Sequence, residues 1–199
     1  MGNLRLYGST SGYVEIAPPA VGSSQVLTLP TDSVQPGLVL VNKTDISAAS
    51  SVSVNNCFSS TYDNYRIVFS GIGTVTATTT VKFRLRASGS DTSAGYYLSG
   101  VYGSQAAGPT RAYNPNTSEY YASEIGDIEN AFTLDVFRPQ VASTRTSLIN
   151  LYSGPGSASS FFGTYYGYIN NTGQFDGFTL FVSSGTFTGT IRVYGYRNS

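Results

Sequence analysis

The alternation of apolar and polar residues along the chain predicts a protein built from β-strands. In Val81–Ala87 every second residue is apolar and the residues between them are basic, which is the pattern of a half-buried strand. Similar runs follow, namely Tyr65–Phe69, Tyr96–Tyr102, Phe132–Phe137, Ser147–Tyr152, Phe161–Ile169, Phe178–Val182 and Ile191–Tyr196. Clusters of Gly, Asn, Ser and Pro separate these runs and indicate turns.

The spacing of the runs predicts an all-β fold. About eight strands follow one another without room for crossover helices, which favours antiparallel pairing. We expect an antiparallel, jelly-roll-like β-sandwich in which two sheets pack face to face. The longest stretch without a clear strand is Ser104–Asn130, which we expect to be a long loop, with room for a helical turn only at Glu119–Ile128.

The first 44 residues have a different pattern. Short apolar runs alternate there with prolines, which end strands or confine them to sheet edges. Because such runs cannot enclose a core, we expect residues 1–44 to form an extended attachment arm and residues 45–199 to form the sandwich. The arm residues expected to bind a partner are Tyr13, Val14, Ile16, Val26, Leu27, Leu29, Leu38, Val39 and Leu40. The alternative is that the segment only adds edge strands to the sandwich.

Composition removes several classes of chemistry. Among 199 residues, 11 are basic and 11 acidic, so there is no excess positive charge to attract a polyanion. The chain has no His and one Cys, which excludes His-activated nucleophiles, imidazole ligands and internal disulfides. We therefore expect no enzyme, no catalytic residue, no metal, no cofactor and no nucleic-acid partner. We also expect no membrane association, because no apolar run is long enough to cross a bilayer.

Tyrosines are the most informative candidates for binding. Several stand next to another aromatic residue, and neighbours in a strand point to opposite faces, so one of each pair leaves the core of its own sheet. Exposed tyrosines stack on sugar rings or anchor protein interfaces. The residues expected to contact a saccharide or a subunit are Tyr96, Tyr97, Tyr102, Tyr113, Tyr120 and Tyr121. The alternative is that these side chains fill the rim of the sandwich.

Charged residues gather in two places. The basic stripe of Val81–Ala87 either contacts an acidic sugar or a neighbouring subunit, or is a solvent face that prevents edge pairing. Four acidic residues form a second group further along the chain. Their spacing fits neither a calcium-binding loop nor the carboxylate pair of a glycosidase. We expect that group to lie in a solvated loop or to pair with the basic stripe across two strands. Its members are Glu119, Glu124, Asp127 and Glu129.

Both ends and the middle of the chain resemble virion structural proteins of tailed phages. Gly8–Ala20 followed by Leu27–Pro30 looks like the N-terminal segment of many such proteins, notably those of marine and cyanobacterial phages. Tyr62–Phe69, Lys82–Ala87 and Gly189–Arg197 are similar to β-rich C-terminal domains of the same class. The resemblance implies a β-sandwich that is made in the host cytoplasm and displayed on the surface of the virion in symmetric copies.

The absence of shaft repeats in so short a chain guides the expected role. We expect a capsid-decoration or cement protein that its arm attaches to other virion proteins, either the major capsid protein or tail and portal components. We expect a homo-oligomer and favour a trimer, because three arms can meet at one local threefold axis. The alternative is a short tail fibre or head fibre that binds a saccharide of the host surface.

Overall fold

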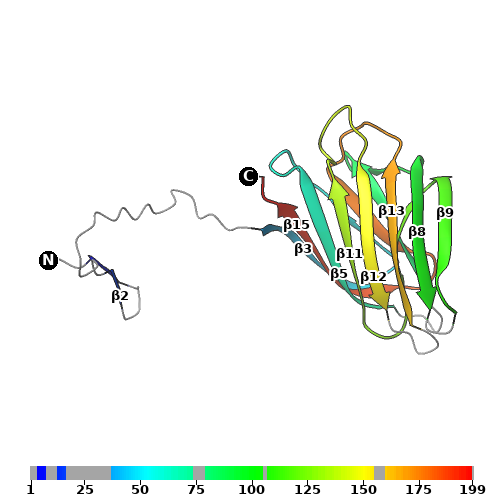
Figure 1. The fold of residues 1–199 in the computed structure, drawn as a ribbon, viewed down its shortest axis with the longest axis horizontal. Coiled ribbons are helices and arrows are strands. Elements are labelled where there is room, and N and C mark those ends of the chain that lie inside the picture. The colour runs from blue at the N-terminus through cyan, green and yellow to red at the C-terminus, as the bar shows by residue number, and fades with distance from the viewer. Residues whose placement is uncertain are drawn as a thin grey trace. The chain divides into compact units, whose positions relative to one another are not determined.

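The chain divides into two units, Met1–Val34 and Gln35–Ser199. The computed structural model describes residues 4–7, 13–16, 37–73, 79–104, 107–154 and 160–198, and all regular elements among them are strands. In the first unit, β1 (Leu4–Tyr7) pairs antiparallel with β2 (Tyr13–Ile16). The second unit holds a sandwich of two antiparallel sheets (Figure 1).

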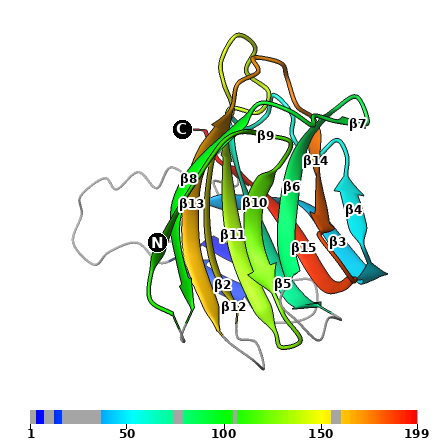
Figure 2. The same ribbon diagram turned by 90° about the vertical axis from the view of Figure 1, so that its right-hand side faces the viewer.

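The two sheets of the sandwich differ in size. The larger sheet consists of β3 (Leu38–Ala49), β5 (Asn64–Gly73), β8 (Tyr96–Ser104), β9 (Thr110–Thr117), β11 (Asn130–Phe137), β12 (Ser147–Gly154), β13 (Phe161–Ile169) and β15 (Phe187–Tyr196). The smaller sheet consists of β4 (Ser51–Val54), β6 (Thr79–Ala87), β7 (Ser90–Asp91), β10 (Tyr120–Ile125) and β14 (Gly177–Val182). Figure 2 shows β10, β6, β14 and β4 as one layer in front of the strands of the larger sheet.

The order of the strands is that of a jelly roll. The larger sheet runs β3-β15-β5-β11-β12-β13-β8-β9, and the smaller runs β10-β6-β14-β4 with β7 beside β6. The strands β3-β15-β5-β11 and β4-β14-β6-β10 form the two jelly-roll sheets, which confirms the expected fold class. Two insertions, after β6 and after β11, supply the remaining strands β12, β13, β8 and β9. These four strands continue the larger sheet past β11, and we call them the extension.

Aromatic rings fill the space between the sheets of the jelly roll. Phe178 of β14 stacks on Phe83 of β6, with 5.4 Å between ring centroids, and on Phe58 at 5.9 Å. On the larger sheet, the rings of Phe69 and Phe132 stack at 5.2 Å. The ring of Phe58 also lies 4.8 Å from that of Tyr65 in β5, so this ring contacts residues of both sheets. Ring pairs at this separation contribute beyond the burial of their area.

The extension reaches past the smaller sheet, so its inner face needs an additional cover. β10, the edge strand of the smaller sheet, packs against β11, β12 and β13. Tyrosines supply the rest: the ring of Tyr165 lies 6.3 Å from that of Tyr102 and 6.1 Å from those of Tyr121 and Tyr152. Gly100 of β8 leaves room for this cluster, because a Cβ there would come within 2.5 Å of the Tyr165 ring.

A buried amide connects the extension to the smaller sheet. Asn150 of β12 accepts the N–H of Tyr165 at 2.8 Å, and its Nδ2 donates to the carbonyl of Ala122 in β10. The hydroxyl of Tyr120, also in β10, donates to the carbonyl of Tyr165 at 2.8 Å. These groups are buried, so removal of the amide would leave the N–H of Tyr165 and the carbonyl of Ala122 without a partner, and water would not replace it.

Two segment boundaries differ from the sequence expectation. Residues 38–44, expected in the arm, form the first part of β3 and pair with β15, so the arm unit ends at Val34. β3 is an edge strand and is exposed on both faces for much of its length. Its residues 42–45 can therefore be polar without alternation, and they did not indicate a strand. The alternative that this segment adds an edge strand to the sandwich is correct for residues 38–44.

The expected long loop Ser104–Asn130 contains two strands. β9 is a sheet edge that includes Pro115 and lacks apolar alternation, so its sequence resembles a loop. In β10 the pairing register shifts between Tyr121 and Ser123, which interrupts the period of two. The described residues of Glu119–Ile128 likewise form strand and turn, and no helical turn.

We predict that Asn150→Ala lowers the free energy of unfolding by about 2–4 kcal/mol, because it leaves several buried polar groups without partners. Urea denaturation followed by tyrosine fluorescence measures the difference. Asn114→Ala, on the exposed edge strand β9, is the matched control and should change stability by less than about 0.5 kcal/mol. Equal effects of the two substitutions would contradict the role of Asn150.

Candidate functional site

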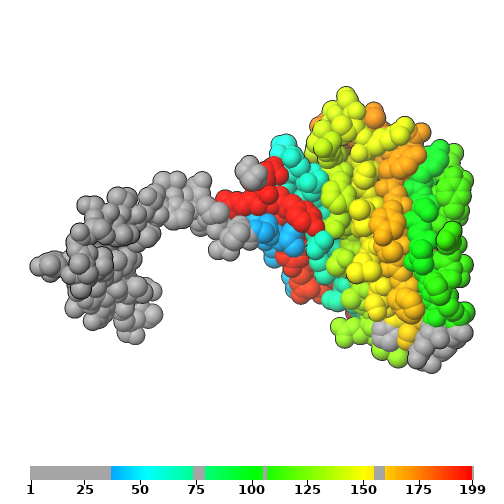
Figure 3. All heavy atoms as spheres, in the orientation of Figure 1, coloured from blue at the N-terminus to red at the C-terminus, as the bar shows by residue number. Residues whose placement is uncertain are grey.

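Exposed apolar side chains gather on the outer face of the extension. Tyr113 is 72% exposed, Leu151 65% and Tyr166 54%. We call the following outward residues the aromatic face: Tyr97, Val101, Tyr113, Ile149, Leu151, Phe162, Tyr166 and Tyr168. Figure 3 shows this side of the molecule, with β12, β13, β8 and β9 side by side in yellow, orange and green.

The aromatic face has almost no charge. Arg111 is the one charged residue among the four strands of the extension. Contiguous groups of exposed apolar side chains are frequent at surfaces that bind other molecules. The rigid sheet beneath fixes the spacing of these side chains, so little conformational freedom is lost when they make contact.

Cross-strand pairing builds a tyrosine groove on this face. Tyr166 of β13 pairs with Ser99 of β8, and Ser99 pairs with Tyr113 of β9. The two tyrosines are therefore two strand spacings apart, about 9.6 Å, with a small side chain between them. Tyr97 and Tyr168 complete the lining of a groove of about 380 Å³.

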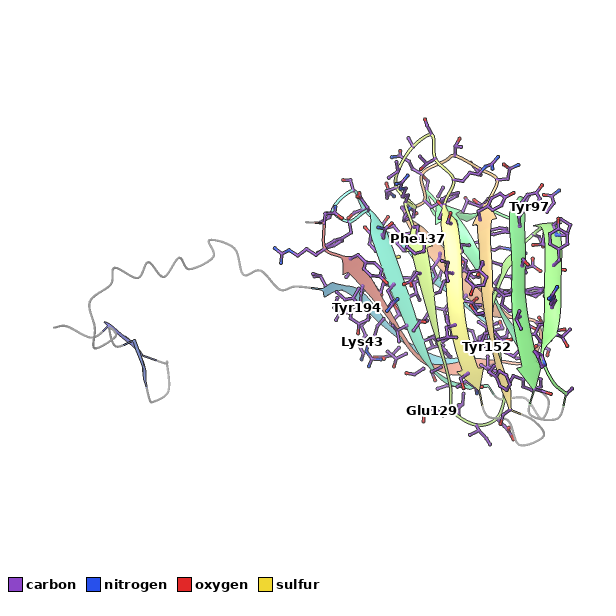
Figure 4. All side chains as sticks on the ribbon, viewed as in Figure 1. Lys43, Tyr97, Glu129, Phe137, Tyr152 and Tyr194 are labelled. Atoms are coloured by element: carbon purple, nitrogen blue, oxygen red, sulfur yellow. The ribbon has the colours of Figure 1, made fainter. Side chains whose placement is uncertain are left out.

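One end of the tyrosine groove carries a stacked pair and a cation. The rings of Tyr97 and Tyr168, which are cross-strand partners, lie 5.2 Å apart and within 6° of parallel. The guanidinium carbon of Arg145 lies 5.2 Å above the centre of the Tyr168 ring. Figure 4 shows Tyr97 at the end of the sheet opposite to that of Glu129. The groove thus joins apolar ring faces to a positive charge.

The six tyrosines predicted from the sequence occupy different places. Tyr97 and Tyr113 line the tyrosine groove. Tyr96 and Tyr120 are fully buried, so their assignment as surface contacts is corrected. The Tyr96 hydroxyl accepts the N–H of Leu85 at 2.8 Å, and burial raises the pKa values of both phenols. These two side chains belong to the core.

Tyr102 and Tyr121 are partly buried around Tyr165, on the inner side of the extension, and not on the aromatic face. The sequence-based selection missed Tyr166, Tyr168 and Arg145. The alternation of side chains along β13 could have identified Tyr166 and Tyr168. When Tyr165 points inward, residues 162, 164, 166 and 168 point outward. No sequence signal placed Arg145, because it lies in the β11–β12 loop.

The predicted arm residues fall into three groups. Tyr13, Val14 and Ile16 lie in β2, and Val26, Leu27 and Leu29 lie outside the described residues. Leu38, Val39 and Leu40 open β3 and pair with the last residues of β15. Leu38 and Leu40 stay largely exposed although they belong to a sheet. The start of β3 therefore presents an apolar edge, close to where Figure 4 shows Lys43 and Tyr194.

The basic stripe on β6 is neutralised by carboxylates. Lys82 Nζ lies 2.8 Å from Glu119 Oε1, and Arg84 Nη2 lies 3.1 Å from Glu119 Oε2. Arg86 forms an ion pair with Asp91. The interpretation that acidic residues pair with the stripe is confirmed for Glu119. All three basic residues of the stripe have a carboxylate partner, so none of them is available to an acidic ligand.

The other acidic residues do not assemble into a site. Glu124 of β10 is partly buried, and burial raises its pKa, whereas Asp127 and Glu129 lie in the exposed β10–β11 turn. Within the described ranges, no three His, Cys, Asp or Glu side chains are grouped as metal ligands would be. The same residues include no helix long and apolar enough to cross a membrane.

No protein-family model matches the chain, and comparisons with curated proteins and with solved structures likewise give no match.

We predict that Glu119 stabilises the fold in a pH-dependent way. Burial alone would raise its pKa, but hydrogen bonds from Lys82, Ser118 and Arg84 lower it from 4.5 to about 2. The contribution is therefore present above the ordinary pKa and is lost as the pH falls towards 2. Glu119→Gln should lower the free energy of unfolding by about 1–2 kcal/mol at pH 7 and by much less near pH 2.5.

Urea denaturation at several pH values tests this prediction. Glu129→Gln is the matched control, since its side chain is exposed and should leave stability unchanged within about 0.5 kcal/mol at each pH. A loss for Glu119→Gln that stays constant from pH 7 to pH 2.5 would show that the ion pairs do not lower the pKa of Glu119.

Proposed function

We propose that the chain is a structural component of a tailed-phage particle, a capsid-decoration module that its N-terminal unit attaches to another virion protein. The observation that carries this proposal is the division of the chain at Val34. β1 and β2 pair with each other, and neither is a strand of the sandwich. A segment that supplies no strand to the sandwich can serve for attachment while the sandwich keeps its own core.

The sandwich supports the same proposal. Jelly rolls are common in viral capsid proteins and in lectins, although a fold alone does not fix a function. Leu38 and Leu40, at the start of β3, are exposed apolar side chains at the edge of the sandwich, next in the chain to the N-terminal segment. In the expected trimer, three such segments would meet at a local threefold axis of the particle.

We predict that deletion of residues 2–34 abolishes incorporation into particles and leaves the sandwich folded. The deletion ends at the unit boundary and removes no strand of either large sheet. Phage that encode the truncated chain should yield purified particles without it, as measured by mass spectrometry, while the protein stays soluble in the lysate. A normal copy number of the truncated chain on the particles would overturn the proposal.

The second function we propose is recognition of a host-surface saccharide, and the tyrosine groove favours it. Tyr113 and Tyr166 present exposed rings at a fixed separation on a neutral surface. Aromatic rings of this kind stack against the apolar faces of sugar rings, and hydroxyl tips supply hydrogen bonds. A decoration protein that displays the groove outward could carry out both functions.

We predict that Tyr166→Ala weakens binding to host-envelope polysaccharide by about tenfold, since a buried aromatic contact is worth about 1–3 kcal/mol. Pull-down of the full-length chain on purified envelopes measures the change. Phe162→Ala is the matched control, because Phe162 is also exposed on β13 but lies outside the groove. Absence of binding by the unsubstituted chain, or equal losses in the two variants, would contradict saccharide recognition at the groove.

A further inference from the structure

A polar pocket lies at the end of the sheet where the tyrosine groove carries its cation. It has a volume of about 580 Å³. It is formed by the loops that follow β7, β11 and β13, together with the end of β9. Its polar lining consists of Thr92, Asn116, Arg145, Asn170, Asn171 and Thr172. Amide and hydroxyl groups dominate this lining, and they are the groups that hydrogen-bond to sugar hydroxyls.

Arg145 lines the pocket and contacts a residue of the groove. It lines the polar pocket, and its guanidinium lies 5.2 Å above the ring of Tyr168, which lines the groove. The two hollows therefore adjoin at this pair of side chains. A ligand longer than one sugar ring can contact the ring faces of the groove and the amides of the pocket at the same time.

Among the residues that the structure describes, no carboxylate forms an ion pair with Arg145. None of the described carboxylates lines the pocket either. The basic residues of β6 differ in this respect, since Lys82 and Arg84 are held by Glu119. A guanidinium in this situation favours an anionic partner, with which it can form two parallel hydrogen bonds.

We propose that the tyrosine groove and the polar pocket together bind an acidic saccharide. The rings of Tyr113 and Tyr166 contact the sugar rings, and Arg145 pairs with a carboxylate or sulfate group on the next residue of the glycan. Asn170 and Asn171 line the part of the pocket that faces the hydroxyl groups of the glycan. This inference rests on the second proposed function, saccharide recognition, and adds the charge of the ligand and the residue that selects it.

Titration of the full-length chain with three oligosaccharides tests the inference. They are a hexuronic acid oligomer, the same oligomer with its carboxyl groups reduced to alcohols, and a sulfated oligomer of equal length. NMR line broadening and calorimetry give the affinities. We expect an acidic oligomer to bind at least about tenfold more tightly than the reduced one, because hydrogen bonds to charged groups are the stronger class.

Substitutions then assign the preference to one residue. Arg145→Gln should remove the preference for the acidic oligomer, so that the acidic and the reduced oligomers bind with similar affinities. Arg111→Gln is the matched control, because it removes the same charge from β9, at a position outside both hollows. Tyr166→Ala should weaken binding of acidic and reduced oligomers alike.

The outcomes separate this inference from the functions on which it builds. Loss of the acidic preference in Arg145→Gln alone supports it, and the sulfated oligomer shows which anionic group is preferred. Equal binding of acidic and reduced oligomers by the unsubstituted chain overturns the inference but leaves saccharide recognition standing. If no oligomer binds, saccharide recognition and this inference both fail, whereas the attachment of residues 1–34 to the particle is judged by the deletion alone.

Discussion

The main physical constraint on this fold is the need to cover the inner face of the extension, where other tyrosines pack around Tyr165. A jelly roll buries its two sheets against each other, but here the larger sheet has four strands beyond that arrangement. Their inner face is covered by β10 and by tyrosines that lie over glycine positions such as Gly100. The amide of Asn150 connects this cluster to β10, so the sandwich continues where the smaller sheet ends.

The same constraint produces the aromatic face. In β8 and β13 a tyrosine that points inward is followed by one that points outward, because successive side chains alternate across a sheet. Burial of Tyr165 therefore exposes Tyr166, and burial of Tyr96 turns Tyr97 to the outside. Because the inner tyrosines fix the strands, the outer ones are held at set distances. The surface is thus organised in advance for contact.

The sequence predicted the strands that are buried on one face and missed those that are not. Val81–Ala87 has one face in the core, and its alternation was sufficient to place it in a half-buried strand. β9 and the start of β3 are sheet edges, where no alternation is required, and β10 contains a bulge. The groove itself could not be predicted, because Tyr113 and Tyr166 come together only when β13 pairs with β8, and β13 is far in the chain from β8 and β9.

The protein has few charged residues, so the surroundings of each one matter for what its surface can bind. On β6 the cations are offset by Glu119 and Asp91, so this side of the sandwich is close to neutral as well as polar. Around the polar pocket, hydroxyl and amide groups surround Arg145 and no carboxylate competes for it. In a protein with more surface charge, one arginine would add little to the selectivity of a shallow site. Arg145 lies beside the ring of Tyr168, and no carboxylate lines its pocket, which is the arrangement that the proposed preference for an acidic ligand requires.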